Sequence, residues 1–209
     1  MGAREEILGR IRSAIADIDP ADAAAEIDWT YGEPVSTGAL NVVDRFAERV
    51  ADYRAIVERV DAAQLAQQVV AALAGVTGSV IGDAQVRERL TAEIDWIDDA
   101  GLTAAQLDAV GAVVTTAAVG IANTGTIVLD HGPGQGRRAV SLVPDLHVCI
   151  VAADQVVSDV PEAVARLIEV GAGTRPQTWI SGPSATSDIE LDRVEGVHGP
   201  RTLHVIIVD

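Results

Sequence analysis

Five short runs rich in Val and Ile in the second half of the chain constrain its fold more than any other feature. They lie at residues 112–116, 126–129, 148–152, 178–180 and 203–208. None of them alternates polar with apolar residues, a pattern typical of strands that are buried on both faces. Such strands belong to sheets covered by helices, so these runs predict a mostly parallel sheet.

Helical apolar spacing dominates the first half of the chain. It predicts helices at 39–54, 61–74, 84–90 and 103–110, short strands at 78–82 and 94–97, and a later helix at 161–170. The predicted fold class is therefore α/β, with a single open, mostly parallel sheet and helices on both of its faces. We expect residues 1–209 to form one domain, with an α/β body at 39–209.

Residues 1–38 are expected to form a helix and an irregular arm. Apolar residues recur at helical spacing between residues 4 and 17, which predicts an amphipathic helix that ends before Pro20. This helix either docks on the body or contacts another subunit. The arm contains Trp29 and Tyr31, which either anchor it to the body or close it over a ligand.

The charge composition excludes several classes of partner. The net charge is −16, and all 15 basic residues are arginine. So acidic a protein repels nucleic acid and anionic membrane surfaces, and we exclude both as partners. Without lysine there is no Schiff base and no phosphate-loop lysine. Arginine, hydroxyls or backbone amides must therefore hold any anionic substrate.

Neither a membrane span nor a secretion signal is evident in the sequence. No apolar run approaches the roughly 18 residues that a transmembrane helix needs. The first six residues, Met1-Gly-Ala-Arg-Glu-Glu6, are charged and lack the apolar core of a signal peptide. We therefore expect a cytoplasmic protein.

The sequence contains no pattern of metal-ligand residues. Its one cysteine, Cys149, lies in an apolar run and cannot alone hold an iron–sulfur cluster or form an internal disulfide. Its four histidines, at positions 131, 147, 198 and 204, lack the spacing of zinc motifs. We expect neither a metal nor another cofactor in this chain.

A polar stretch between two predicted strands contains most of the candidate chemistry. Within it, Ser184 and Thr186 follow Gly182-Pro183 as candidate helix N-caps. The free amides at the start of such a helix would suit a small anion. The same residues could equally serve as a cap and a turn without any ligand.

The end of this stretch contains the candidate acid–base groups. His198 lies in Gly196-Val-His-Gly-Pro200, where flanking glycines leave it accessible, and imidazole suits proton transfer near neutrality, so it is the candidate general base. Asp188 and Glu190 either act as a base with its orienting group or favour a helix N-terminus electrostatically.

Two earlier loops are expected to meet this stretch, because ligands in open α/β sheets bind beyond the carboxyl ends of strands. The loop at 120–126 contains Asn123 and Gly125, which suit a tight turn that brings amides inward. It is either a ligand loop or an ordinary turn.

The second loop, at 130–138, ends with adjacent Arg137 and Arg138. Their guanidinium groups either bind a carboxylate or phosphate or pair with surface acids. His147 follows at the start of a predicted strand and is either a core histidine or a catalytic one.

Four sequence blocks in a fixed order carry a family resemblance. They are Asn123-Thr-Gly-Thr126, Ser141-Leu-Val-Pro-Asp-Leu-His147, Gly182-Pro-Ser-Ala-Thr-Ser-Asp-Ile-Glu190 and Gly196-Val-His-Gly-Pro200. Together they resemble the lactate-utilization C proteins, small members of the LUD-domain family. The segment at 3–12 is similar too, so the resemblance covers nearly the whole chain.

The resemblance implies a fold like that of the glucosamine-6-phosphate deaminase, ribose-5-phosphate isomerase and CoA-transferase group. It also implies a role in oxidising L-lactate to pyruvate beside iron–sulfur partner proteins. We expect a small anionic metabolite such as lactate to contact Asn123, Thr124, Gly125, Thr126, Arg137, Arg138, His147, Gly182, Ser184 and Thr186. The expected catalytic residues are His198, Asp188 and Glu190.

One position departs from the family pattern. An acid is often found where this chain has Asn123, and an amide cannot replace a nucleophilic or basic carboxylate. A turn or hydrogen-bonding role is therefore expected there. Two other functions stay open: a self-contained isomerase or CoA-transferase-like enzyme, and a non-catalytic assembly subunit.

Overall fold

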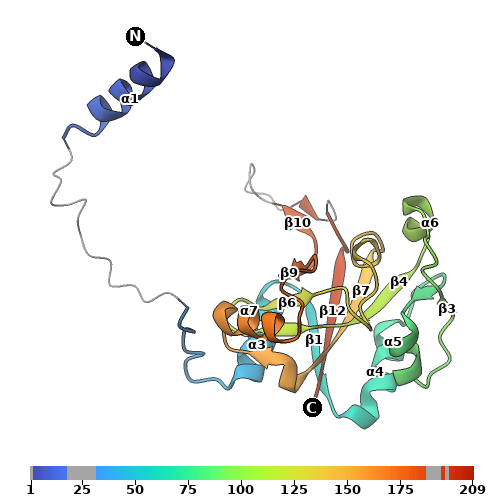
Figure 1. Cartoon of the computed structure of the whole chain (residues 1–209). Coiled ribbons are helices and arrows are strands. Elements are labelled where there is room, and N and C mark those ends of the chain that lie inside the picture. Colours follow the sequence, from blue (N-terminus) through green and yellow to red (C-terminus); the bar gives the residue numbers. More distant parts are fainter. Residues whose placement is uncertain (1, 18–31, 187–193, 196–197) are drawn as a thin grey trace. The chain divides into compact units, whose positions relative to one another are not determined.

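The computed structural model describes residues 2–17, 32–186, 194–195 and 198–209 (Figure 1). Contacts within the chain divide it into two compact units, residues 1–33 and 34–209.

The described part of the first unit contains the helix α1 (Ala3–Ala14), which confirms the predicted N-terminal helix. The Gly2 amide donates to Glu5 Oε2 over 2.7 Å and thereby satisfies one free N–H at the helix start. No residue of α1 is buried, and Ile7 and Ile11 are 58% and 50% exposed. The predicted helix end before Pro20, and the aromatic residues of the arm, lie outside the described residues.

The second unit is built on a sheet of six strands. Their order across the sheet is β1 (Ile56–Val60), β12 (Thr202–Val208), β7 (Leu146–Ala152), β4 (Ala112–Thr116), β2 (Val80–Ile81) and β3 (Trp96–Ile97). Every neighbouring pair is parallel, which confirms the predicted open α/β sheet. The sequence does not predict β1, because Glu58 and Arg59 interrupt the apolar residues of this edge strand.

The prediction of a single sheet is wrong. A second sheet has the order β8 (Val156–Val157), β5 (Val119–Ile121), β6 (Thr126–Leu129) and β9 (Thr178–Ile180). In it β6 is antiparallel to both β5 and β9, and β5 is parallel to β8. A turn in which Gly125 has a φ of +59° reverses the chain before β6. Both faces of this sheet are covered, so its strands have the same uninterrupted apolar sequence as parallel ones.

Ser184 does not cap a helix, and a helix that began after Thr186 would lie outside the described residues. Residues Ala185–Thr186 form strand β10, which pairs antiparallel with β11 (Val194–Glu195). The backbone at residues 185–186 is therefore extended, and its amides cannot form the first turn of a helix.

The other helices of the described residues overlap the predicted helical segments. They are α3 (Val42–Asp52), α4 (Leu65–Ala72), α5 (Ala84–Arg89), α6 (Ala104–Asp108) and α7 (Val160–Glu169), with short 3-10 turns at Ala62–Gln64, Arg138–Ser141 and Ala153–Gln155. A reciprocal cap between Thr103 and Gln106 starts α6, where the Thr103 amide donates to Gln106 Oε1 over 2.9 Å. Within the described part of the chain, no helix is both long and apolar enough to cross a membrane.

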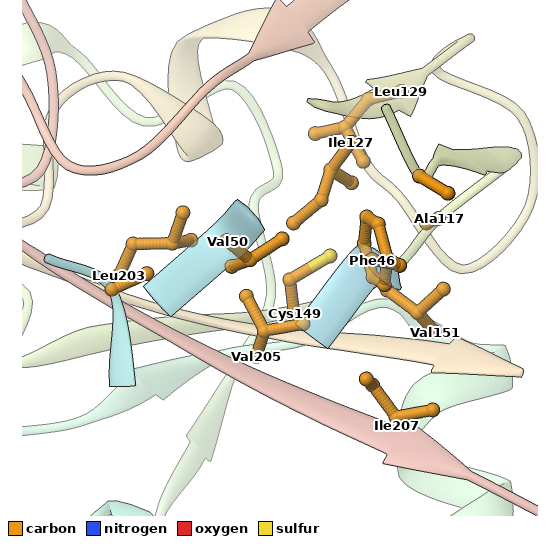
Figure 2. Close-up of a cluster of buried hydrophobic side chains, with 12 residues drawn as sticks. Phe46, Val50, Ala117, Ile127, Leu129, Cys149, Val151, Leu203, Val205 and Ile207 are labelled. Carbon is orange, nitrogen blue, oxygen red and sulfur yellow. The ribbon is translucent and has the colours of Figure 1, made fainter. Parts of the chain in front are cut away.

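Helices cover both faces of the main sheet, as predicted. On one face, α4 and α5 pack Leu65, Val69 and Val86 into a cluster with residues of β4, β7 and β12. On the other face, α3 packs Phe46 and Val50 against β7, β12 and the second sheet (Figure 2). Helix α7 packs against the second sheet through Ala163 and Leu167.

The winding of the main sheet reverses between β2 and β4. The chain passes from β2 outward to β3 and then returns to β4 on the other side of β2. Helix α5 follows β2 and packs Val86 on one face, whereas Ala117 follows β4 and packs on the other. These diverging connections leave a crevice beyond the carboxyl ends of β2 and β4, the usual ligand position in open α/β sheets.

Truncation of Phe46 is expected to destabilise the second unit strongly. Phe46 is 0% exposed, and a Cβ built on Gly120 would lie 3.1 Å from its Cζ atom. Phe46→Ala should lower the free energy of unfolding by about 3–5 kcal/mol in a denaturant titration. The control Ile168→Ala truncates a side chain that is 63% exposed and should change it by no more than about 0.5 kcal/mol. Equal effects of the two substitutions would contradict the packing of α3.

Candidate functional site

Two predicted ligand loops press their glycines against the last turn of α3. A Cβ built on Gly125 would lie 2.7 Å from the Arg49 carbonyl carbon, and one on Gly182 would lie 2.6 Å from Tyr53 Cβ. Both glycines have positive φ, +59° and +84°. Only glycine combines that backbone conformation with so close an approach, so α3 fixes where both loops lie.

A chain of hydroxyl groups joins these two loops. Thr124 Oγ1 donates to Thr126 Oγ1 over 2.8 Å, and Thr126 Oγ1 lies 2.8 Å from Ser181 Oγ. Thr126 is only 5% exposed. The hydroxyl groups of the Asn-Thr-Gly-Thr block therefore position the start of the Ser181–Ser184 loop through the Thr126–Ser181 contact.

The Ser181–Ser184 loop forms one wall of a cavity of about 220 Å³, the small cavity. Its polar lining consists of Ser141, His147, Thr178, Ser181, Ser184 and His198, and its apolar lining includes Leu142, Trp179, Ile180 and Leu203. The cavity lies at the amino ends of β7 and β12 and the carboxyl end of β9. A water molecule occupies about 30 Å³ in the liquid, so this volume suits a small organic molecule.

Backbone and hydroxyl groups hold the two loops of the small cavity together. The His198 amide donates to Ser184 Oγ over 2.9 Å, and the Ser184 amide donates to the Pro200 carbonyl over 2.8 Å. The Ser184 hydroxyl accepts in this arrangement, so its own proton can be donated into the cavity. The His198 side chain lines the cavity and is exposed at its mouth.

His147 is the buried polar group of this cavity. It is 1% exposed, its Nε2 lies 2.8 Å from Thr115 Oγ1, and its Nδ1 has no hydrogen-bond partner among the described residues. Burial lowers the pKa of His147 to about 4, so the imidazole is neutral at physiological pH. A buried ring nitrogen without a partner is uncommon in native proteins, and His147 is the residue of the cavity lining that has one.

The crevice at the winding reversal is larger, about 500 Å³, but its charges are already paired. Arg137 donates to both Asp99 oxygens over 2.6 and 2.7 Å, and Arg87 forms an ion pair with Asp98. Asp83 accepts from the Val86 amide over 3.1 Å. Arg137 was expected either to bind an anionic ligand or to pair with an acid of the protein. The structure shows the second arrangement, an ion pair with Asp99.

The loop at 130–138 joins the crevice to the small cavity. Gln135 is 5% exposed, and its Oε1 accepts from the amides of Asp130 and His131 over 2.7 and 3.1 Å. His131 Nε2 in turn lies 2.8 Å from Thr178 Oγ1, which lines the small cavity. Sequence reasoning missed Gln135 and Thr178. Gln135 is a polar residue between two glycines, and Thr178 is a hydroxyl residue at the start of an apolar strand. Neither pattern is a strong sequence signal for a residue that supports or lines a cavity.

The predicted site residues fall into three places instead of one. His147, Gly182, Ser184 and His198 line the small cavity, and Thr126 reaches it through Ser181. Arg137 lines the crevice, while Asn123 and Thr124 line a separate hollow of about 190 Å³ beside the end of α3.

The other predicted residues lie away from these cavities or outside the described residues. Arg138 begins an exposed turn, where its carbonyl accepts from Ser141 Oγ over 3.1 Å. Thr186 lies in β10, while Asp188 and Glu190 lie outside the described residues. Among the residues that the structure does describe, no group of three His, Cys, Asp or Glu side chains could hold a metal ion.

Asn123 has a hydrogen-bonding role in this chain. Its Nδ2 donates to the Val35 carbonyl over 2.7 Å, and its amide donates to the Ser158 carbonyl over 3.0 Å. A carboxylate at this position could not donate to Val35. The side-chain amide of Asn123 thus connects the segment before α3 to the loop between β5 and β6 of the second sheet. This agrees with the expected hydrogen-bonding role.

Substitution of Gly182 is expected to show how tightly its loop is held. Gly182→Ala combines a left-handed backbone with a clash against Tyr53, whereas Gly171→Ala places a methyl group at a φ of +73° with nothing within 4 Å. Backbone strain alone should cost about 1 kcal/mol in each variant. In denaturant titrations, the loss of unfolding free energy should therefore be much larger for Gly182→Ala than for Gly171→Ala. Equal losses would mean that the loop does not press on α3.

Acid should destabilise the fold through His147. In the unfolded chain His147 titrates near 6.5, whereas in the folded protein burial lowers its pKa to about 4. The unfolded state therefore binds the additional proton between these pH values, and stability falls as pH drops through this window, by up to about 3 kcal/mol. His147→Phe should make the loss of unfolding free energy between pH 7 and about pH 4.5 smaller by roughly 2 kcal/mol. An unchanged loss would contradict a neutral, buried His147.

Comparisons with known proteins identify the family of this chain. A family model described as the LUD domain matches residues 38–208. Lactate utilization protein C of Deinococcus radiodurans is 42% identical over 207 residues, which cover 99% of this chain and 95% of the relative. Lactate utilization protein C of Bacillus subtilis (strain 168) is 34% identical over 101 residues, covering 46% of this chain and 42% of the relative.

A solved structure is similar as well. The crystal structure of a DUF162 family protein from Deinococcus radiodurans has a TM-score of 0.70 and 41% identity, and the match covers 84% of this chain and 100% of that chain. The family model and the nearly full-length relative lead to one conclusion. The chain belongs to the LUD-domain family, as a homologue of lactate utilization protein C.

Proposed function

We propose that this protein is a subunit of an L-lactate utilization system, in which it supports the oxidation of L-lactate to pyruvate beside iron–sulfur partner proteins. The full-length similarity to lactate utilization protein C supports the assignment to such a system. The observation that carries a ligand-binding role is the small cavity, whose polar lining includes His147, Ser184 and His198.

The small cavity has the groups that a small hydroxy acid requires. The Ser184 hydroxyl can donate to a carboxylate, since it accepts from the His198 amide and keeps its own proton. His198 lies at the mouth, where a protonated imidazole would attract the same anion. Leu142 and Leu203 supply apolar surface for a methyl group. A single small anion with one apolar end matches this lining.

Electron transfer is assigned to the partners. Oxidation of a hydroxy acid removes two electrons, which side chains of this kind cannot accept without a cofactor. Cys149 is the one cysteine of the chain, and a single thiol cannot hold an iron–sulfur cluster. We therefore assign this subunit a non-redox role, with the iron–sulfur clusters in its partners.

We place the system in the cytoplasm and relate the parallel sheet to the isomerase and CoA-transferase group named above. We assign ligand binding to the body at 39–209 and treat residues 1–38 as its N-terminal helix and arm.

Substitutions at the polar stretch should abolish growth on lactate without unfolding the protein. His198→Ala and Asp188→Ala should each fail to restore growth of a deletion strain on L-lactate, because they remove the proposed acid–base groups. Melting temperature should stay close to that of the wild type, since neither residue belongs to an apolar sequence pattern of a helix or strand. The control Glu169→Ala, an exposed acid on α7, should grow normally. A large fall in melting temperature for both variants would instead indicate a structural role.

The purified chain should not oxidise lactate on its own. A dye-linked lactate assay should show no reduction until the iron–sulfur partners are added, and activity should then depend on this subunit. An absorbance scan of the isolated chain should show no visible bands. Visible bands, or dye reduction without partners, would mean that this chain holds the redox chemistry. Turnover of a sugar phosphate or acyl substrate by the isolated chain would favour a self-contained enzyme.

A further inference from the structure

Helix α1 has an exposed apolar face, the α1 stripe, which consists of Ile7, Leu8, Ile11 and the C-cap residue Ile15. No residue of α1 is buried, and the three isoleucines are 58%, 50% and 51% exposed. Isolated helices of about 12 residues are marginal in water, and most helices in proteins are stabilised by the packing of such a face. The α1 stripe therefore requires a surface that covers it.

The α1 stripe is not part of the LUD domain. The family model matches residues 38–208, and none of the core clusters found among the described residues includes a residue of α1. The match to lactate utilization protein C of Deinococcus radiodurans covers 99% of this chain, so that relative has a counterpart of the helix. The packing of the domain's core therefore does not account for the stripe.

Charged residues flank the α1 stripe on both sides, with acids toward the start of the helix and arginines toward its end. At 100° per residue, Glu6 and then Arg10 lie on one side of the stripe, and Glu5 and then Arg12 lie on the other. Arg4 lies in line with the stripe itself, where its aliphatic stem can cover apolar surface. Both flanks thus change from negative to positive along the helix.

We propose that α1 pairs in antiparallel orientation with α1 of a second copy of this chain and so forms a dimer. Helices that pack along a shared apolar stripe bring their flanking residues together. Antiparallel pairing places Glu6 beside Arg10 of the second copy and Glu5 beside Arg12 of the second copy, and the two-fold symmetry repeats both contacts. Parallel pairing would place acids beside acids and arginines beside arginines. The charge pattern therefore selects the antiparallel dimer.

The distribution of charge along the chain also favours α1 as the contact between copies. Residues 1–17 contain three arginines and three acids, so their formal charges balance. The net charge of −16 therefore comes from the rest of the chain, and it makes two copies repel each other. Contact through α1 adds no further repulsion of this kind.

The dimer should be reversible. A standard protein interface takes roughly 20–30 residues from each partner, whereas α1 has only 12. Interfaces of smaller size are typical of weak association. The fraction of dimer is therefore expected to rise with protein concentration. This interface goes beyond the proposed function and does not depend on the small cavity.

Sedimentation equilibrium of the full chain tests the contact. The apparent mass of the wild type should rise from one chain toward two with concentration. Ile11→Ser should weaken dimerisation at least about tenfold, because each dimer loses two buried isoleucine side chains. The control Ser13→Ala changes an exposed residue on the opposite side of α1 and should leave dimerisation unchanged. A monomeric wild type at every concentration, or equal dimerisation of the wild type and Ile11→Ser, would overturn the proposal.

Charge reversal tests the complementarity. The double variants E5R/E6R and R10E/R12E each give a helix whose flanks carry one sign, so each alone should dimerise more weakly than the wild type. An equimolar mixture of the two should recover dimers, because every flank then meets its opposite charge. A helix that failed to form would not be recovered by mixing. Absence of recovery would contradict the pairing of these flanks.

Disulfide trapping tests the orientation. Ala3→Cys and Ala14→Cys place thiols at opposite ends of α1 on the same side of the stripe, and the native Cys149 is buried and does not compete. Under mild oxidation, a mixture of the two variants should form mainly the mixed disulfide between positions 3 and 14. Disulfides mainly between identical positions would show parallel pairing and would overturn the proposal.

Discussion

The insertion of the last strand between two earlier strands of the main sheet is the constraint on which the site depends. Strand β12 lies between β1 and β7, and its Leu203 is the register partner of His147. Parallel strands begin at the same edge of a sheet, so the segments before β7 and before β12 must meet there. The Thr202 amide donates to the Asp145 carbonyl over 2.9 Å and ties these segments together. The residues that line the small cavity are brought together by this pairing.

Much of the fold could be predicted from the sequence, because helices and buried strands have different periods. The sequence could not separate the two sheets, since Ile127 and Leu129 are as buried in the second sheet as residues such as Val205 are in the first. Nor could it predict β1, where Glu58 accepts from His204 in the neighbouring strand and so makes a polar residue compatible with an edge strand. The division into two sheets and the position of β1 both depend on which strands pair, and that pairing joins segments far apart in the sequence.

The candidate site was predictable in part for the same reason. Residues close in sequence, such as Gly182 and Ser184, are found together, and His198 joins them through a backbone hydrogen bond. Arg137 could not be placed, because the acid that binds it, Asp99, is 38 residues away in the chain. His147 could be read as either a core or a functional histidine. In the structure it is buried like the former, and its unpartnered nitrogen makes it a candidate for the latter.

Ligands in open α/β sheets usually bind beyond the carboxyl ends of the strands, where the winding reverses. In this protein, the chemistry of the side chains favours a different cavity. The crevice lies where such sheets usually bind ligands, yet its arginines are occupied by Asp98 and Asp99. Exposed ion pairs of this kind are worth at most about 1 kcal/mol, so they do not close the crevice to a ligand. An unpartnered buried nitrogen is the stronger requirement, because leaving it unpaired costs about 1–3 kcal/mol. We therefore propose the small cavity as the ligand site.

The most direct test of this choice is to map where L-lactate binds. Backbone amide shifts of ¹⁵N-labelled protein, recorded during a titration with L-lactate, report on each wall separately. We predict that the affected amides cluster at Ser181, Gly182, Ser184, 198–199 and His147, and that those at 82–84 and 135–137 stay unchanged. Shifts confined to the crevice residues, or none at all, would contradict the account.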